Sequence, residues 1–198
     1  VFYFFIFRMQ SDSHPFGMKK SPLSFEIETE KLEVRMSGLT MQDKIWIEYE
    51  KFVLSTLKEG KLHDLGYPIH GLCGEISELW LEIVKISTQQ EVINEAGDVL
   101  WYLMLLLVTQ KEEFTDFIFP SEPRNVSTIQ IMRWIDKLSK YATQHDFDKV
   151  SKRWKPRENC QPIRIYLTEI CEYLLLASGL TWDELIKSNV EKLTKRLL

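Results

Sequence analysis

The sequence predicts an all-α protein, a helical bundle of about five to six helices. Apolar residues recur at helical spacing over most of the chain after residue 39, and only eight of the 198 residues are glycine. Strand and helix patterns do not alternate, and no tandem repeat is evident. With 44% hydrophobic and 27% charged residues, the composition is that of an ordinary globular protein and does not indicate disorder.

The first helix is expected to begin after Thr40, where Asp43 completes a capping box, and to end before Gly60. Its apolar stripe comprises Ile45, Tyr49, Phe52 and Leu57. The next stretch is rich in residues that interrupt helices, which predicts a loop. These residues are Gly66, Pro68 and Gly71.

A second helix is expected from about residue 72 to residue 87, and a third from Glu91 to about Phe114. The third contains the longest apolar run, Val99–Val108. A membrane span needs about 18–20 apolar residues. This run is shorter and acids precede it, so it predicts a buried helix in a protein without membrane association.

Further helices are expected at 128–146 and 161–178, separated by a polar loop containing Pro156 and Pro162. The last helix should open at Thr181, with Glu184 completing a capping box, and run to the C-terminus. Two divisions of the chain follow. Residues 1–38 are expected to form an N-terminal extension outside the core, and residues 39–198 the helical domain.

The net charge of −4 argues against a generic nucleic-acid partner. The cysteines are odd in number, scattered and never in CxxC spacing, which predicts free thiols in a reducing compartment and a cytoplasmic location. They are Cys73, Cys160 and Cys171.

Two pairs of carboxylates carry the main chemical signal. Glu75 and Glu78 are three residues apart in the second predicted helix, and Glu95 and Asp98 are three apart in the third. Such spacing places both acids of a pair on one helix face, and a short connection would bring the two pairs together. Four converging acids in apolar surroundings require cations, for which a hard divalent ion is the simplest choice.

The final helix offers a complementary face. Asn189, Lys192 and Arg196 lie at positions i, i+3 and i+7, so a cationic and amide-bearing surface is available for phosphate oxygens. Trp101 and Tyr102 follow the acids and are candidates to stack on a base, although aromatic residues at helical spacing usually belong to a core.

Two other metal chemistries fit less well. Di-iron bundle proteins carry Glu-x-x-His motifs, but the residues three positions after Glu75 and Glu95 are acids. An HD-type phosphohydrolase needs several metal-binding histidines, and the chain has four in all, without supporting context.

In this order, the motifs resemble those of the MazG-like all-α nucleoside triphosphate pyrophosphohydrolases, which include dimeric dUTPase-like and dCTP pyrophosphatase-like members. The acidic pairs match the ExxE and ExxD signature, and residues 189–196 are similar to the family's N-x-x-K-L-x-x-R segment. The resemblance covers residues 40–114 and 179–197. Residues 115–178 are longer than the corresponding connection in small members, so an extra helical segment is expected between the third and last family helices.

The resemblance implies Mg²⁺, for which Mn²⁺ can substitute, held by Glu75, Glu78, Glu95 and Asp98. The implied reaction is hydrolysis of a (deoxy)nucleoside triphosphate to the monophosphate and pyrophosphate, in nucleotide-pool housekeeping. Glu78 is the candidate general base, and a homodimer or homotetramer is the implied assembly. The alternative is a non-catalytic helical interaction or regulatory module that retains the fold.

Overall fold

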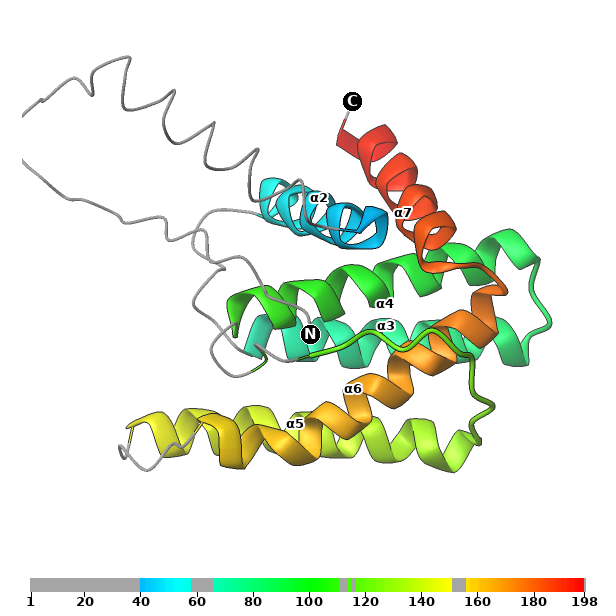
Figure 1. Cartoon of the computed structure of the whole chain (residues 1–198). Helices are drawn as coiled ribbons and strands as arrows, with labels where there is room; N and C mark the ends of the chain where they lie inside the picture. Colours follow the sequence, from blue (N-terminus) through cyan, green and yellow to red (C-terminus); the bar gives the residue numbers. More distant parts are fainter. Residues whose placement is uncertain (1–39, 58–65, 111–113, 115–116, 151–155, 198) are drawn as a thin grey trace, which may run out of the picture.

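The computed structural model describes residues 40–57, 66–110, 114, 117–150 and 156–197, with side chains left out for 145–150, 156–161 and 197. This part of the chain consists of helices joined by short segments, without a strand (Figure 1). The helices are α2 (Met41–Thr56), α3 (Gly66–Val84), α4 (Gln89–Thr109), α5 (Thr128–Val150), α6 (Pro156–Ser178) and α7 (Trp182–Leu197). The predicted all-α class is thereby confirmed. The N-terminal extension lies outside the described residues.

Helix α4 is the centre of the bundle. It packs along α3, and α2, α6 and α7 also contact it. In Figure 1, α2 and α7 lie on one side of the α3–α4 pair, and α5 and α6 lie on the other. Both α5 and α6 belong to the segment in which the sequence predicted extra helices.

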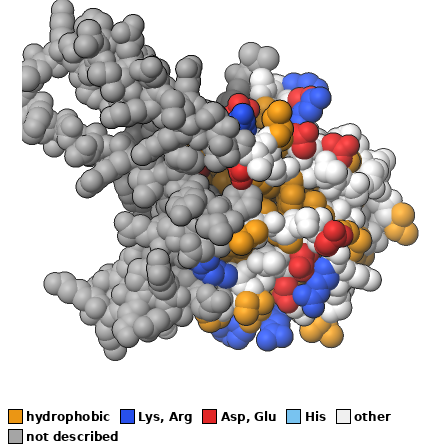
Figure 2. Space-filling model, viewed as in Figure 1, with side chains coloured by type: hydrophobic (Ala, Val, Ile, Leu, Met, Phe, Trp, Pro, Cys, Tyr) orange, Lys and Arg blue, Asp and Glu red, His pale blue; other side chains and the backbone are white. Residues whose placement is uncertain are grey.

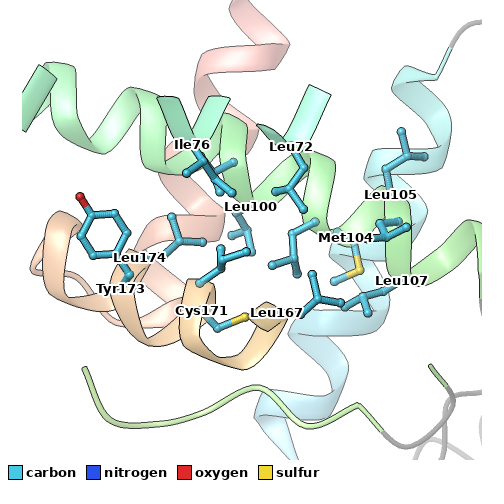
Figure 3. Close-up of a cluster of buried hydrophobic side chains, with 14 of the residues drawn as sticks. Leu72, Ile76, Leu100, Met104, Leu105, Leu107, Leu167, Cys171, Tyr173 and Leu174 are labelled. Carbon is cyan, nitrogen blue, oxygen red and sulfur yellow. The ribbon is translucent and has the colours of Figure 1, made fainter. Parts of the chain in front are cut away.

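All of the described helices contribute to the apolar core, and part of it lies between α3, α4 and α6. Figure 3 shows Leu72 and Ile76 of α3, Leu100 and Met104 of α4, and Leu174 of α6 pointing toward one another. All five side chains are at most 1% exposed. Burial of this kind contributes about 1.5–3 kcal/mol per large side chain, so this contact fixes the α3–α4–α6 arrangement.

Helix α4 is also long and apolar enough to cross a membrane, as judged by length and hydropathy alone. However, 56% of that window is buried within the protein. Because its apolar side chains already contact other helices, α4 fits the predicted role of a core helix.

The turn between α3 and α4 is a Schellman motif. The Ser87 N–H donates to the Glu82 carbonyl and the Ile86 N–H donates to the Ile83 carbonyl. Ile86 therefore adopts a left-handed conformation with φ of 58°, although glycine is usual at this position. Thr88 then caps α4 with Glu91 through a capping box. This short turn returns the chain so that α4 packs against α3, as the sequence predicted.

The capping boxes predicted at Thr40 and Thr181 are confirmed. Thr40 and Asp43 exchange hydrogen bonds at the start of α2. At the start of α7, the Thr181 N–H donates to the Glu184 carboxylate at 2.9 Å, and the Glu184 N–H donates back to the Thr181 hydroxyl.

Two predicted loops are too long, because prolines and glycines assigned to them lie inside helices. The rest of each loop, residues 58–65 and 151–155, lies outside the described residues. Helix α3 begins at Gly66 and not near residue 72, so Pro68 falls in the first turn, where its missing N–H costs no hydrogen bond. Gly71 also lies inside α3, where the Tyr102 ring leaves no space for a side chain: an added Cβ would lie 2.0 Å from that ring. Pro156 begins α6, and Pro162 lies inside that helix.

Candidate functional site

Three of the predicted acids converge between α3 and α4. Glu75 of α3 and Glu95 and Asp98 of α4 each offer a carboxylate oxygen, and these oxygens lie within 4.8 Å of one another. All three residues are partly buried. The arrangement follows from local structure, because Glu95 and Asp98 are one helical turn apart and the Schellman turn sets α3 beside them.

Burial and the close approach of the carboxylates raise the pKa values of Glu75 and Glu95. The pKa of Glu75 is raised from 4.5 to about 7, mainly by burial and further by the charges of Asp98, Glu78 and Glu95. Burial also raises the pKa of Glu95. The protein without a cation therefore holds more negative charge here than it can stabilise, as expected at a functional site.

Lys192 of α7 supplies one positive charge to the cluster. Its Nζ donates to Asp98 Oδ2 at 2.5 Å and to the Asn94 carbonyl at 2.8 Å. The side chains of Lys192 and Asp98 are only 13% and 16% exposed. This is a shielded ion pair, which is stronger than a pair on the surface.

Arg196 lies one turn beyond Lys192 and is more loosely attached. Its guanidinium is 4.0 Å from Asp98 Oδ2, and its side chain is 63% exposed. The guanidinium is thus free to turn toward an anionic ligand while remaining beside the acids.

Asn189, predicted as a substrate ligand, lies at the junction of α2, α4 and α7. It is 1% exposed, and its Oδ1 accepts a 2.9 Å hydrogen bond from the Tyr49 hydroxyl. Its Nδ2 is buried without a hydrogen-bond partner among the described residues. An added Cβ on Gly97 would lie 2.8 Å from this Nδ2, so the Asn189 amide packs on the glycine between the two α4 acids.

The two candidate aromatic residues, Trp101 and Tyr102, are neighbours on α4, and their rings contact each other. The Trp101 Nε1 donates to the Thr56 hydroxyl of α2 at 3.0 Å. The Tyr102 ring is edge-on to Trp101, with centroids 4.8 Å apart, and 5.9 Å from the Tyr67 ring of α3. Both Trp101 and Tyr102 are partly buried, and they remain candidates for contact with a base.

Glu78 is not one of the three clustered acids, but it lies near them. Its side chain is exposed, but its charge raises the pKa values of both Glu75 and Glu95, so it is close to them. The structure thus leaves the Glu78 carboxylate facing solvent beside the cluster. Glu82, one turn further along α3, bonds Lys85 and Ser87 and stabilises the Schellman turn.

The sequence pattern predicts only that Tyr49 belongs to an apolar stripe, and it gives no signal for Tyr67. Tyr49 is 140 positions from its partner Asn189. No local pattern reports such a contact. The tight fit of Gly71 under Tyr102 was also hidden, although a glycine in an apolar helical pattern is a general sign of close packing.

The cluster contains only hard oxygen donors from carboxylates, which suit magnesium, calcium or manganese better than zinc or copper. No family model, curated protein or solved structure matches the chain. The geometry and chemistry of the site must therefore support any functional proposal.

Proposed function

We propose that the protein is a MazG-like, magnesium-dependent pyrophosphohydrolase, which hydrolyses a (deoxy)nucleoside triphosphate to the monophosphate and pyrophosphate. The observation that carries this proposal is the convergence of Glu75, Glu95 and Asp98 beside Lys192. Carboxylates from two helices can hold a divalent cation, and a lysine and an arginine at their edge can bind phosphate. Proteins use this combination for phosphoric anhydrides.

The residues present fit magnesium, because the three carboxylates carry more negative charge than Lys192 balances. Glu75, Glu95 and Asp98 would hold the ion, with Glu78 as a further ligand. Bound magnesium would neutralise phosphate oxygens and lower the pKa of a water molecule. Mn²⁺ has similar ligand preferences and should substitute.

The side chains around the cluster have complementary roles in the proposal. The exposed Glu78 carboxylate accepts a proton from the attacking water as general base. Lys192 and Arg196 bind the negative oxygens of the departing pyrophosphate. Asn189 holds α7 in place, and the Trp101 and Tyr102 rings, which are edge-on to each other, each offer an apolar face to the base.

We further propose that the protein acts in the cytoplasm as a homodimer or homotetramer. Apolar side chains near the end of α3 support a second copy as partner, since Leu81, Val84 and Ile86 are 41%, 57% and 91% exposed. Figure 2 shows the view of Figure 1 with charges of both signs and hydrophobic side chains between them. Light scattering coupled to gel filtration will measure the assembly.

The proposed activity can be tested by measuring pyrophosphate release. The full chain is incubated with each common ribo- and deoxyribonucleoside triphosphate and magnesium. We expect release with at least one nucleotide, and a loss of at least about a hundredfold in Glu95→Gln and Asp98→Asn, because removing a ligand charge weakens the metal site by several kcal/mol. Asp136→Asn is the matched control, because Asp136 is exposed on α5 and pairs only with Lys140 among the described residues.

A chain that releases no pyrophosphate from any nucleotide is not this enzyme. Equal activity in the wild type and both site variants would place the chemistry elsewhere. In the first case, the non-catalytic helical module becomes the better description.

A further inference from the structure

Lys192 occupies the position in which a cation would bind Asp98. We propose that Lys192 is a built-in counter-ion: it neutralises the acidic cluster of the metal-free protein, a divalent cation displaces it from Asp98, and it then binds the nucleotide phosphates. This inference rests on the proposed function and adds to it a coupling between metal and nucleotide binding. The coupling follows from distances, burial and charge.

The Lys192 ammonium and a metal ion compete for Asp98 Oδ2. Lys192 Nζ lies 2.5 Å from that oxygen. Magnesium binds carboxylate oxygens at about 2.0–2.1 Å and keeps several water molecules. A metal ion on this shielded oxygen, in a residue 16% exposed, would therefore lie close to the ammonium, and the two positive charges would repel each other.

Charge makes the exchange favourable when a divalent cation arrives. Lys192 brings one positive charge to three acids, and it lowers the pKa values of both Glu75 and Glu95. The burial and mutual repulsion of the acids outweigh its effect, because both pKa values remain raised. A doubly charged ion compensates more of this repulsion, while the lysine holds the cluster together in its absence.

The side chain can move without the helix. The Tyr49–Asn189 hydrogen bond and the packing of Asn189 on Gly97 anchor α7 one turn before Lys192. The lysine side chain is a flexible chain of four carbons, so the ammonium can move away from Asp98 while the backbone stays in place. Arg196 already lies on this side of the cluster, 4.0 Å from Asp98, and both cations can then face one phosphate chain.

The exchange predicts that metal and nucleotide bind cooperatively. Metal alone must break the Lys192–Asp98 pair and leave the ammonium without a carboxylate partner. Metal arriving with a triphosphate gives that ammonium a new anion. By linkage, each ligand then raises the affinity for the other by the same factor.

The test is a titration of the full chain with Mn²⁺ alone, followed by electron paramagnetic resonance, for the wild type and Lys192→Met. Methionine keeps the apolar stem and removes the competing charge. We expect Lys192→Met to bind Mn²⁺ about tenfold more tightly, the factor expected when a shielded ion pair no longer competes. Binding of a non-hydrolysable triphosphate with Mn²⁺ should weaken about tenfold. Tighter binding of Mn²⁺ together with weaker binding of the triphosphate in Lys192→Met identifies the exchange.

Lys195→Met is the matched control, because Lys195 is exposed on the same helix. It should change neither affinity by more than about twofold. Lys192→Gln is a second variant in case the methionine protein does not fold, which circular dichroism will show. Unchanged or weaker Mn²⁺ binding in a folded Lys192 variant overturns the exchange while the metal site stands. Absence of Mn²⁺ binding in wild type and variants alike overturns both the exchange and the proposed function.

Discussion

The two sides of the α3–α4 pair are built differently. On the side of α2 and α7, polar contacts between the helices accompany buried apolar side chains. These polar contacts join Lys192 to Asp98, Tyr49 to Asn189, and Trp101 to Thr56. On the side of α5 and α6, the contact with α4 is a layer of hydrophobic side chains (Figure 3). The described acids that could hold a metal belong to α3 and α4. The lysine that pairs with one of them, Lys192, belongs to α7.

Polar groups also occur on the α5–α6 side. Glu172 Oε2 of α6 accepts no hydrogen bond among the described residues, but the Arg124 guanidinium lies 3.6 Å from it. Glu169 of α6 accepts hydrogen bonds from Gln130 and from the Trp134 indole of α5, at 2.7 and 2.8 Å. On the α7 side, Asn189 Nδ2 lacks a partner and two carboxylates have raised pKa values. The difference indicates that α5 and α6 stabilise the bundle, whereas the α7 side retains unfavourable contacts that a ligand can relieve.

The largest effect on stability should come from the apolar side. Leu174 of α6 is fully buried in the core. Replacing it with alanine removes apolar contacts and leaves a cavity, so we expect Leu174→Ala to lower the free energy of unfolding by about 2–5 kcal/mol. Urea denaturation will measure this loss. Leu176→Ala on the same helix is the control, because Leu176 is 43% exposed and should cost much less.

The same variant tests whether the two sides are separate. At a temperature where Leu174→Ala remains folded, its Mn²⁺ affinity should equal that of the wild type. A tenfold loss of metal affinity in the folded variant would show that the α6 packing also sets the positions of the α3 and α4 acids.

Local patterns predicted part of this comparison. The acid pairs and the capping boxes depend on residues three positions apart, and a helix places such residues on one face whatever surrounds them. The capping boxes at Thr40 and Thr181 were therefore predictable, as was the approach of Glu75 to Glu95 and Asp98.

Contacts between distant segments could not be predicted in this way. The Tyr49–Asn189 bond joins helices far apart in the sequence. The sequence predicts too late a start for α3, because glycine usually interrupts a helix. At Gly71 the missing side chain instead makes room for Tyr102 of the neighbouring helix. Tertiary packing decided the conformation there, against local propensity.

Two glycines, Gly74 in α3 and Gly97 in α4, provide the next prediction. Gly97→Ala should shift α7, because its Cβ would lie 2.8 Å from Asn189 Nδ2 and 3.1 Å from Asn189 Cβ. Gly74→Ala meets nothing within 4 Å and should stabilise α3 by about 0.5–1 kcal/mol. We expect Gly97→Ala to lose about 1 kcal/mol of stability, since the strain exceeds the gain in helix propensity. Thermal denaturation of both variants, beside the wild type, will show the opposite signs.

The Mn²⁺ affinities of the two glycine variants provide a second test of this packing. Because Gly97 lies next to Asp98 and beneath Asn189, its substitution should also alter Mn²⁺ binding, whereas Gly74→Ala should leave it within about twofold. Equal stability changes in the two variants would contradict the close packing of α7 on α4.

An effect of similar size is expected for the pH dependence of the metal-free protein. The folded-state pKa of Glu75 is about 7, above its ordinary value of 4.5, mainly through burial. Between these values the folded protein retains a proton that the unfolded chain has lost, so the free energy of unfolding should fall as pH rises from 5 to about 7 and then level off. Because Glu75 is only half buried, solvent screening reduces the expected loss to about 1 kcal/mol.

This dependence separates the charged α7 side from the apolar α6 side. Urea titrations at pH 5 and 8 in a chelator should show the loss in wild type and in Leu176→Ala, and a smaller one in Glu75→Gln, which has no proton to release. Glu95 should supply the remainder, because its pKa is also raised. Added magnesium favours the charged carboxylates and should restore stability at pH 8. A loss of equal size in Glu75→Gln would assign the pH dependence to groups outside the cluster, and the α7 side would no longer be the region that needs a cation.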